Sequence, residues 1–272
     1  MSDRVVDTRP FRRALARIDA RPSPLVGPIR ALLRLGARLA GFRVVVEGQK
    51  ILPRDAAGRV AGGWILAGAP HRAWVDPLLL IVAWPAGAPR LAWLGDGPTL
   101  VRSWWRRLLL PRLGVIPIVP GSGPRAMADH AAAARGVLGR GAVLALFVER
   151  GAPSHPQKTR EIAGGFAWMS LAADAPVVPV VIGGAHRIVR GSPFIVRFLA
   201  PLPRPALSAR PATGGPCVSA VDPIDRSRRA AAEALVDAYR DAVAGPVGET
   251  AAWADARAPR AARWPWLATL FH

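Results

Sequence analysis

The chain has 272 residues, of which 51% are hydrophobic, so it can bury the core of one large α/β domain or of two small ones. Lysine and arginine together number 37 against 18 acidic residues, a formal net charge of +19. This charge indicates an anionic partner: nucleic acid, an anionic membrane surface or a phosphorylated substrate. Because only Lys50 and Lys158 are lysines, the arginine-rich composition fits phosphate recognition and a GC-rich genome equally well.

Several classes of protein are excluded. A lone cysteine, Cys217, rules out an intramolecular disulfide framework and fits a reducing compartment. The N-terminus opens with polar residues and lacks the apolar region of a signal peptide. Uncharged stretches fall short of the ~18 residues that a spanning helix needs, so we expect a protein that is soluble or lies on a membrane.

The first 41 residues are predicted to form basic amphipathic helices. The second of these, 29–40, carries three arginines on one face: Arg30, Arg34 and Arg38. A cationic amphipathic helix of this kind is typical of membrane interfaces. A surface helix that covers the core has the same pattern, so the sequence leaves both interpretations open.

Strands and helices alternate from residue 42 onward. Strands are predicted at 42–48, 63–67, 90–94, 114–119, 142–148, 176–182 and 194–198. Helices are predicted at 77–84, 98–112, 125–138, 162–173 and 226–244, with an irregular segment at 201–224. This order predicts a single α/β domain at 42–245, with a mixed, largely parallel sheet flanked by helices. The amphipathic helices of 1–41 precede it, and a C-terminal tail at 246–272 follows.

Tryptophan is unusually frequent, with ten residues against one tyrosine. Trp104 and Trp105 lie among arginines, and tryptophan beside arginine is typical of a bilayer interface. We therefore expect these two residues, with the arginines of 29–40, to contact an anionic membrane. The expected location is peripheral, on the cytoplasmic face.

The segment from Gly68 to Pro77 is where the sequence places the chemistry. His71 and Asp76 lie between a predicted buried strand and a predicted buried helix, a junction that carries functional groups in open α/β sheets. On a regular helix these positions would point about 140° apart, so the pair can meet only if the segment turns. Asp before Pro is also an ordinary helix start, which leaves a purely structural role open for Asp76.

Four blocks in a fixed order extend this pattern. His71 to Pro77 has the form H-x4-D-P and 178–184 the form V-P-V-x-I-x-G. Residues 114–118 read G-V-I-P-I, close to a G-x-I-P-V block, and 147–149 read F-V-E, close to the start of an F-P-E-G-T-R-S block. Over roughly residues 60–205 the chain resembles the glycerolphosphate/lysophosphatidic acid acyltransferase superfamily of PlsC-like 1-acylglycerol-3-phosphate acyltransferases, as a divergent member. The resemblance implies that His71 and Asp76 are catalytic.

The second and third blocks depart from the family pattern, which associates them with binding the acceptor's phosphate. Pro120 stands where arginine is usual, with Arg125 the nearest guanidinium, and Arg150 directly follows the glutamate. The predicted substrate-binding residues are Glu149, Arg150, Gly151, Arg125, Gly121, Ser122 and Gly123. The glycine turn at 121–123 opens a predicted helix and can present backbone N–H groups to an anion. These departures leave the acceptor headgroup open.

The chemistry of acyl transfer suits the same residues. A lipid hydroxyl attacks a thioester once a base takes its proton, and His71 can be that base while Asp76 fixes its tautomer. The chain has no G-x-S-x-G elbow, which favours direct transfer from acyl-CoA or acyl carrier protein, the expected donors and partners. No cluster has metal-ligand spacing, so we expect no metal and no other cofactor.

Two other functions remain open. A catalytically inactive relative could use the same scaffold to bind membranes. A basic nucleic-acid-binding protein would explain the charge of +19, but the chain has few Phe and Tyr residues for base stacking and no known binding motif.

Overall fold

A computed structural model describes residues 18–97, 103–118, 123–150, 161–186, 188, 190–204 and 223–258. Its main sheet contains β1 (Arg43–Glu47), β2 (Ile65–Ala69), β3 (Leu91–Asp96), β4 (Val115–Ile118), β5 (Val143–Phe147), β8 (Val177–Gly183) and β9 (Pro193–Phe198). The strand order is β1-β9-β8-β2-β5-β3-β4, and only the β8–β9 pair is antiparallel. The prediction of a mixed, largely parallel sheet is confirmed. A separate antiparallel pair joins β6 (Glu149–Arg150) to β7 (Glu161–Ile162).

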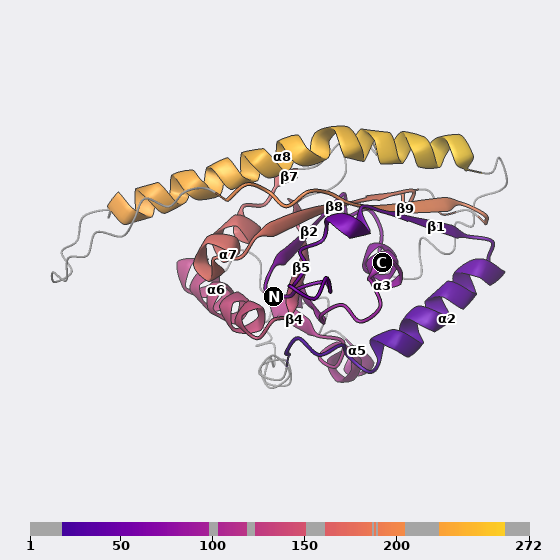
Figure 1. Ribbon diagram of the computed structural model, residues 1–272, viewed down its shortest axis with the longest axis horizontal. Helices are drawn as coiled ribbons and strands as arrows, with labels where there is room; N and C mark the ends of the chain where they lie inside the picture. Colours follow the sequence, from indigo (N-terminus) through magenta and orange to yellow (C-terminus); the bar gives the residue numbers. More distant parts are fainter. Residues whose placement is uncertain are drawn as a thin grey trace, which may run out of the picture.

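Helices cover both faces of the sheet, as Figure 1 shows. They are α2 (Val26–Leu39), the short 3-10 helix η1 (Gln49–Ile51), α3 (Asp76–Ala83), α5 (Trp104–Leu109), α6 (Gly123–Gly139), α7 (Gly165–Ala173) and α8 (Pro223–Arg257). One core cluster joins the sheet to α6, α7 and α8, and the other joins it to α2 and α3. The fold is therefore a three-layer α/β sandwich.

The central strand β2 illustrates how the sequence builds two cores. Side chains alternate between the faces of a strand. Ile65, Ala67 and Ala69 accordingly lie in the core beneath α6, α7 and α8, whereas Leu66 lies in the core against α3. All five residues of β2 are buried, as expected for an interior parallel strand.

Helix α8 is longer than predicted. The predicted helix ends at residue 244, but α8 continues to Arg257 with Pro246 inside it. The reason is packing: the buried residues Tyr239, Val243, Val247, Ala251 and Ala254 form one stripe along the sheet-facing side. Burial of this stripe offsets the hydrogen bond that proline cannot make. The domain boundary placed at residue 245 thus falls inside α8.

Helix α2 lies against α3, and its arginines have an intramolecular role that the sequence did not reveal. Arg30 donates a hydrogen bond to the Trp84 carbonyl and Arg34 one to the Val82 carbonyl, each at 2.9 Å. Gln49 donates to the Ala83 carbonyl at 2.6 Å. Three carbonyls at the C-terminal end of α3 thereby accept hydrogen bonds from side chains. The two guanidinium groups lie at the negative end of the helix dipole.

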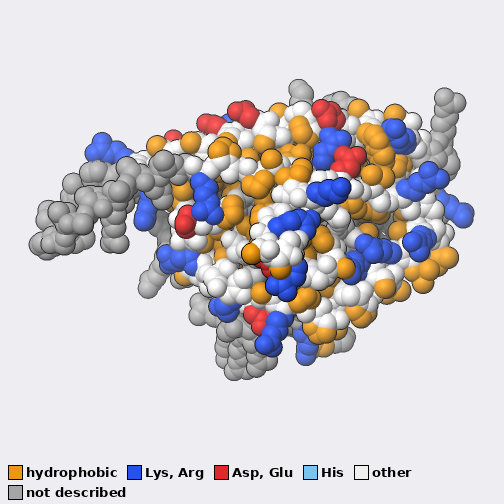
Figure 2. Space-filling view, viewed as in Figure 1, with side chains coloured by type: hydrophobic (Ala, Val, Ile, Leu, Met, Phe, Trp, Pro, Cys, Tyr) orange, Lys and Arg blue, Asp and Glu red, His pale blue; other side chains and the backbone are white. Residues whose placement is uncertain are grey.

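The outer side of α2 is apolar. Leu32, Leu35 and Leu39 are 69%, 54% and 75% exposed. Figure 2 shows hydrophobic side chains next to basic ones on the surface over this helix. Within the described ranges, no helix has both the length and the apolarity needed to span a bilayer.

The close contact between α8 and β8 gives a stability prediction. A Cβ on Gly183 would lie 2.6 Å from the Thr250 carbonyl oxygen and 2.8 Å from the Ile195 side chain. Gly183→Ala should therefore lower the free energy of unfolding by about 1–3 kcal/mol in urea titrations. At Gly248, on α8 two residues before Thr250, an added Cβ meets nothing within 4 Å, so Gly248→Ala should be neutral or slightly stabilising. Equal stability of the two variants would contradict the close approach.

Candidate active site

The candidate site lies at the carboxyl ends of two neighbouring strands. His71 follows β2, and Glu149 follows β5, which pairs with β2 in parallel. Helix α3, after β2, packs on one face of the sheet, whereas α7, after β5, packs on the other. Where consecutive connections leave a sheet toward opposite faces, open α/β folds hold their ligands. The topology therefore brings these two predicted residues to the expected position.

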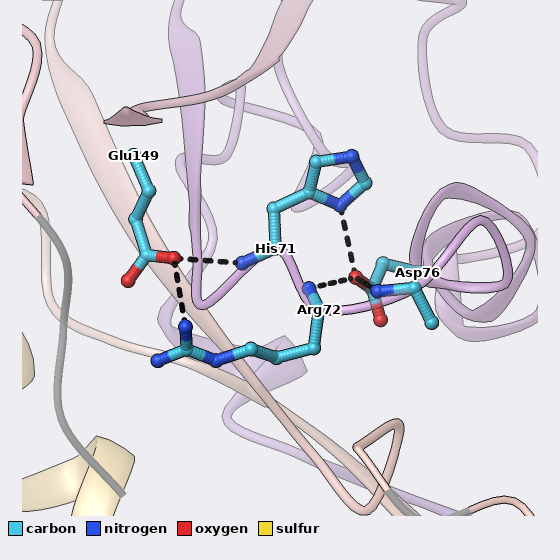
Figure 3. Close-up of polar contacts among 5 residues, drawn as sticks. His71, Arg72, Asp76 and Glu149 are labelled. Atoms are coloured by element: carbon cyan, nitrogen blue, oxygen red, sulfur yellow. Dashed lines mark hydrogen bonds and ion pairs between the residues drawn. The ribbon is translucent and has the colours of Figure 1, made fainter. Parts of the chain in front are cut away.

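His71 and Asp76 are in direct contact. The His71 Nδ1 atom lies 2.9 Å from Asp76 Oδ2 (Figure 3). The carboxylate side chain has no exposed surface, whereas the imidazole is 41% exposed. With Nδ1–H donating to the carboxylate, the lone pair resides on Nε2, at the opposite edge of the ring. The predicted turn between the two residues is confirmed.

One carboxylate oxygen organises that turn. Asp76 Oδ2 also accepts hydrogen bonds from the backbone N–H groups of Arg72, at 2.7 Å, and Ala73, at 2.9 Å. Asp76 itself begins α3, with Pro77 in the first turn, where a fixed φ favours helix initiation. Asp76 Oδ1 is buried and accepts no hydrogen bond among the described residues. The aspartate is thus both the start of the helix and the partner of the histidine.

The side chain of Glu149 is buried next to the main chain of His71 and does not lie on the surface. Its carboxylate accepts a hydrogen bond from the His71 backbone N–H at 3.1 Å and lies 3.9 Å from Arg72 Nη1 (Figure 3). The side chains of Glu149 and Arg72 are 0% and 4% exposed. The sequence analysis singled out Glu149 but did not foresee its contacts with these two neighbours.

The imidazole rests on an aromatic ring. Phe147, the last residue of β5, stacks against His71 with ring centroids 4.1 Å apart and planes inclined by 13°. Its register partner on β2 is Gly68, where an added Cβ would lie 2.9 Å from the Phe147 ring. A glycine inside an apolar strand signals such a close approach, although the sequence analysis did not use it.

Tyr239 connects α8 to the strand that precedes the site. Its hydroxyl, fully buried, donates a hydrogen bond to the Ala67 carbonyl at 3.1 Å. Burial raises the pKa of Tyr239 well above its ordinary value, and the nearby Glu149 carboxylate raises it further. The phenol therefore stays protonated and remains a donor. No local pattern predicts this contact, because it joins residues 172 positions apart.

The other predicted site residues lie elsewhere or outside the described part. Gly123 begins α6, which also contains Arg125, and Arg150 lies in β6. Trp104 and Trp105 begin α5. Gly121, Ser122 and Gly151 lie outside the described residues. The structure thus brings together His71, Asp76 and Glu149, and leaves the rest of the predicted binding set untested. Within the described ranges, no three potential metal ligands converge.

An apolar groove begins next to the histidine turn. It has a volume of about 230 Å³ and lies between α2, α3 and the β1–β9 edge of the sheet. Its walls include Leu33, Gly36, Phe42, Trp74, Leu78 and Phe194. Trp74 lines this groove and belongs to the H-x4-D segment, three residues after His71. Its side chain is 37% exposed.

A histidine oriented by a carboxylate at the strand ends of an α/β sheet is an arrangement that is chemically able to accept and release a proton. Residues 43–183 match the Acyltransferase family model, which covers both strand ends, and the chain belongs to that family. The resemblance predicted from the four sequence blocks is confirmed.

Comparison with solved structures finds similarity to the 1-acyl-sn-glycerophosphate (LPA) acyltransferase PlsC from Thermotoga maritima. The two chains are 16% identical, with a TM-score of 0.45 over 78% of this chain and 79% of that one. Comparison with curated proteins gives no match.

The two members of the His–Asp pair should differ in their effect on stability. Asp76→Ala would leave three buried or half-buried donors without their acceptor, at about 1–3 kcal/mol each. We expect a loss of about 3 kcal/mol or more in the free energy of unfolding, measured by denaturant titration. His71→Ala, at a partly exposed ring, should cost only about 1 kcal/mol. The reverse order would show that the bonds to Asp76 do not hold the turn.

Proposed function

We propose that this acyltransferase moves a fatty acyl group from acyl-CoA or acyl carrier protein to a hydroxyl of a lysophospholipid, of the 1-acylglycerol-3-phosphate type, or of another polar lipid. His71 is the general base. The observation that carries the proposal is the contact of its Nδ1 with a fully buried carboxylate, which leaves Nε2 on an exposed ring. Family membership supports the class of reaction.

The mechanism follows from this arrangement. Nε2 takes the proton of the acceptor hydroxyl as its oxygen attacks the thioester carbonyl, and Asp76 stabilises the imidazolium that forms. A carbon–oxygen bond forms and the carbon–sulfur bond breaks. The departing thiolate then takes the proton from Nε2, which restores the neutral imidazole. No covalent acyl-enzyme is needed, so the chain requires only one base and a site that aligns two substrates.

We also propose that the apolar groove holds the fatty chain. Its described lining is aliphatic and aromatic, and an alkyl chain gains free energy in proportion to the apolar area that it buries. The rim at Trp74 belongs to the same turn as His71, so we propose that a chain in the groove presents its thioester carbon toward the base. The acceptor's polar group would then meet the remaining predicted residues, Arg125, Arg150 and the glycines at 121–123 and 151.

The proposed location is the cytoplasmic face of the membrane, with the protein bound peripherally. The exposed leucines of α2 suit the acyl boundary of a bilayer, and the net charge of +19 suits anionic headgroups. Because Arg30 and Arg34 hold α3, we propose the leucines and Arg38 as the main lipid contacts of α2. We propose Trp104 and Trp105 of α5 as further lipid contacts, in line with the prediction from the sequence.

The reaction is tested by thioester-dependent acyl transfer to a panel of lysophospholipids and glycolipids. His71→Ala should lower kcat by about 10²–10⁴-fold in a folded protein, because the hydroxyl loses its base. The matched control is His186→Ala, since His186 pairs with Asp255 on α8 at 3.0 Å and should leave activity within twofold. Equal activity of wild type and His71→Ala would remove His71 from the mechanism. Tight vesicle binding without activity in any protein would favour an inactive relative.

The membrane proposal is tested with α2. Replacement of Leu32, Leu35 and Leu39 by serine should weaken binding to vesicles of mixed zwitterionic and anionic lipid at least tenfold in sedimentation assays, because these exposed side chains can no longer enter the bilayer. Val236→Ser on α8, at the opposite face of the sheet, serves as the control. Unchanged vesicle binding would exclude α2 as the docking element. Preference for DNA over vesicles would favour a nucleic-acid-binding protein.

A further inference from the structure

We propose that Glu149 and Phe147, at the carboxyl end of β5, are positioning residues that hold His71 for proton transfer, and that Glu149 does not bind the acceptor. The inference rests on the proposed role of His71 as the base. It differs from the sequence-based expectation, which placed Glu149 among the substrate-binding residues.

The burial of Glu149 is the first argument. Its side chain has no exposed surface, and one of its oxygens accepts the backbone N–H of His71 itself. Removing a carboxylate from water is costly unless other groups compensate, and Arg72, 3.9 Å away and equally buried, supplies the opposite charge. The Glu149 carboxylate is therefore already bound to groups of the protein itself, and its hydrogen bond holds the main chain of His71 in place.

The Phe147 ring is the second argument. It lies nearly parallel to the imidazole at 4.1 Å, so it restricts rotation of the His71 ring about its Cβ–Cγ bond. Gly68 leaves the space in which the Phe147 ring lies. The ring plane that results directs Nδ1 toward Asp76, at 2.9 Å.

The three contacts act on different parts of one residue. Glu149 holds the His71 main chain, Phe147 holds the face of its ring and Asp76 holds its Nδ1 edge. Positional errors of about 1 Å in a catalytic group can cost about a hundredfold in rate. Phe147 ends β5 and Glu149 follows two residues later, and β5 pairs with β2 up to Phe147, so the strand pair sets the position of the base.

Two variants of Glu149 separate positioning from substrate binding. Glu149→Gln keeps an oxygen that can accept the His71 N–H, and its kcat should stay within about threefold. Glu149→Ala removes that acceptor; kcat should fall about 10–100-fold while KM for donor and acceptor stays within twofold. Glu249→Gln, at an ion pair with Arg197 on the surface, is the control and should leave kcat unchanged.

The bond itself is measured by NMR in the full chain. The His71 amide should exchange slowly in wild type and in Glu149→Gln, and much faster in Glu149→Ala. The ¹⁵N signals of its imidazole should report Nδ1–H as the main tautomer in wild type and shift in Phe147→Leu. Phe166→Leu is the matched control, since Phe166 is buried against Tyr239 and should lose stability without changing these signals.

The outcomes are distinct. A raised acceptor KM in Glu149→Ala, with His71 signals and amide exchange as in wild type, would overturn the proposal and assign Glu149 to the acceptor. Fast exchange of the His71 amide in wild type would also overturn it, even if no Ala variant folds. If no acyl transfer is detected with any substrate, the proposed function fails, while the exchange and ¹⁵N measurements still decide whether β5 positions the histidine.

Discussion

The site depends on the acceptor capacity of one buried oxygen. Asp76 Oδ2 receives two main-chain N–H groups and the imidazole, so the same atom closes the turn after β2 and orients His71. A substitution that removes this oxygen therefore removes both the hydrogen bonds of the turn and the partner of the imidazole. A histidine attached to a flexible loop would sample many orientations, whereas here the oxygen that closes the loop also binds the ring.

The sheet supplies the second constraint. Because β2 and β5 are adjacent and parallel, their ends bring two segments separated by more than 70 residues into contact. Helix α3, after β2, and helix α7, after β5, pack on opposite faces of the sheet, and open α/β folds hold their ligands at such positions. The region that matches the Acyltransferase family model, residues 43–183, contains β1 to β8 and therefore both strand ends of the site.

Local patterns were enough to predict much of this arrangement. Apolar strands, a histidine before an Asp-Pro helix start and a glutamate after a buried strand are visible in the sequence, and their elements were predicted within a few residues. Long-range contacts were not visible. The burial of Glu149 beside Arg72, the hydrogen bond from Tyr239 to Ala67 and the arginines that satisfy α3 join residues far apart in the chain. The extension of α8 past Pro246 was missed because packing outweighed local preference.

Helix α3 has a partner at each end. At its start, Asp76 holds the histidine, and at its finish, the Val82, Ala83 and Trp84 carbonyls hold α2 and Gln49. With eight residues, the helix is about 12 Å long, a stiff rod of two turns. The contacts of α2 and the partner of His71 therefore lie at opposite ends of one short helix, about 12 Å apart along its axis.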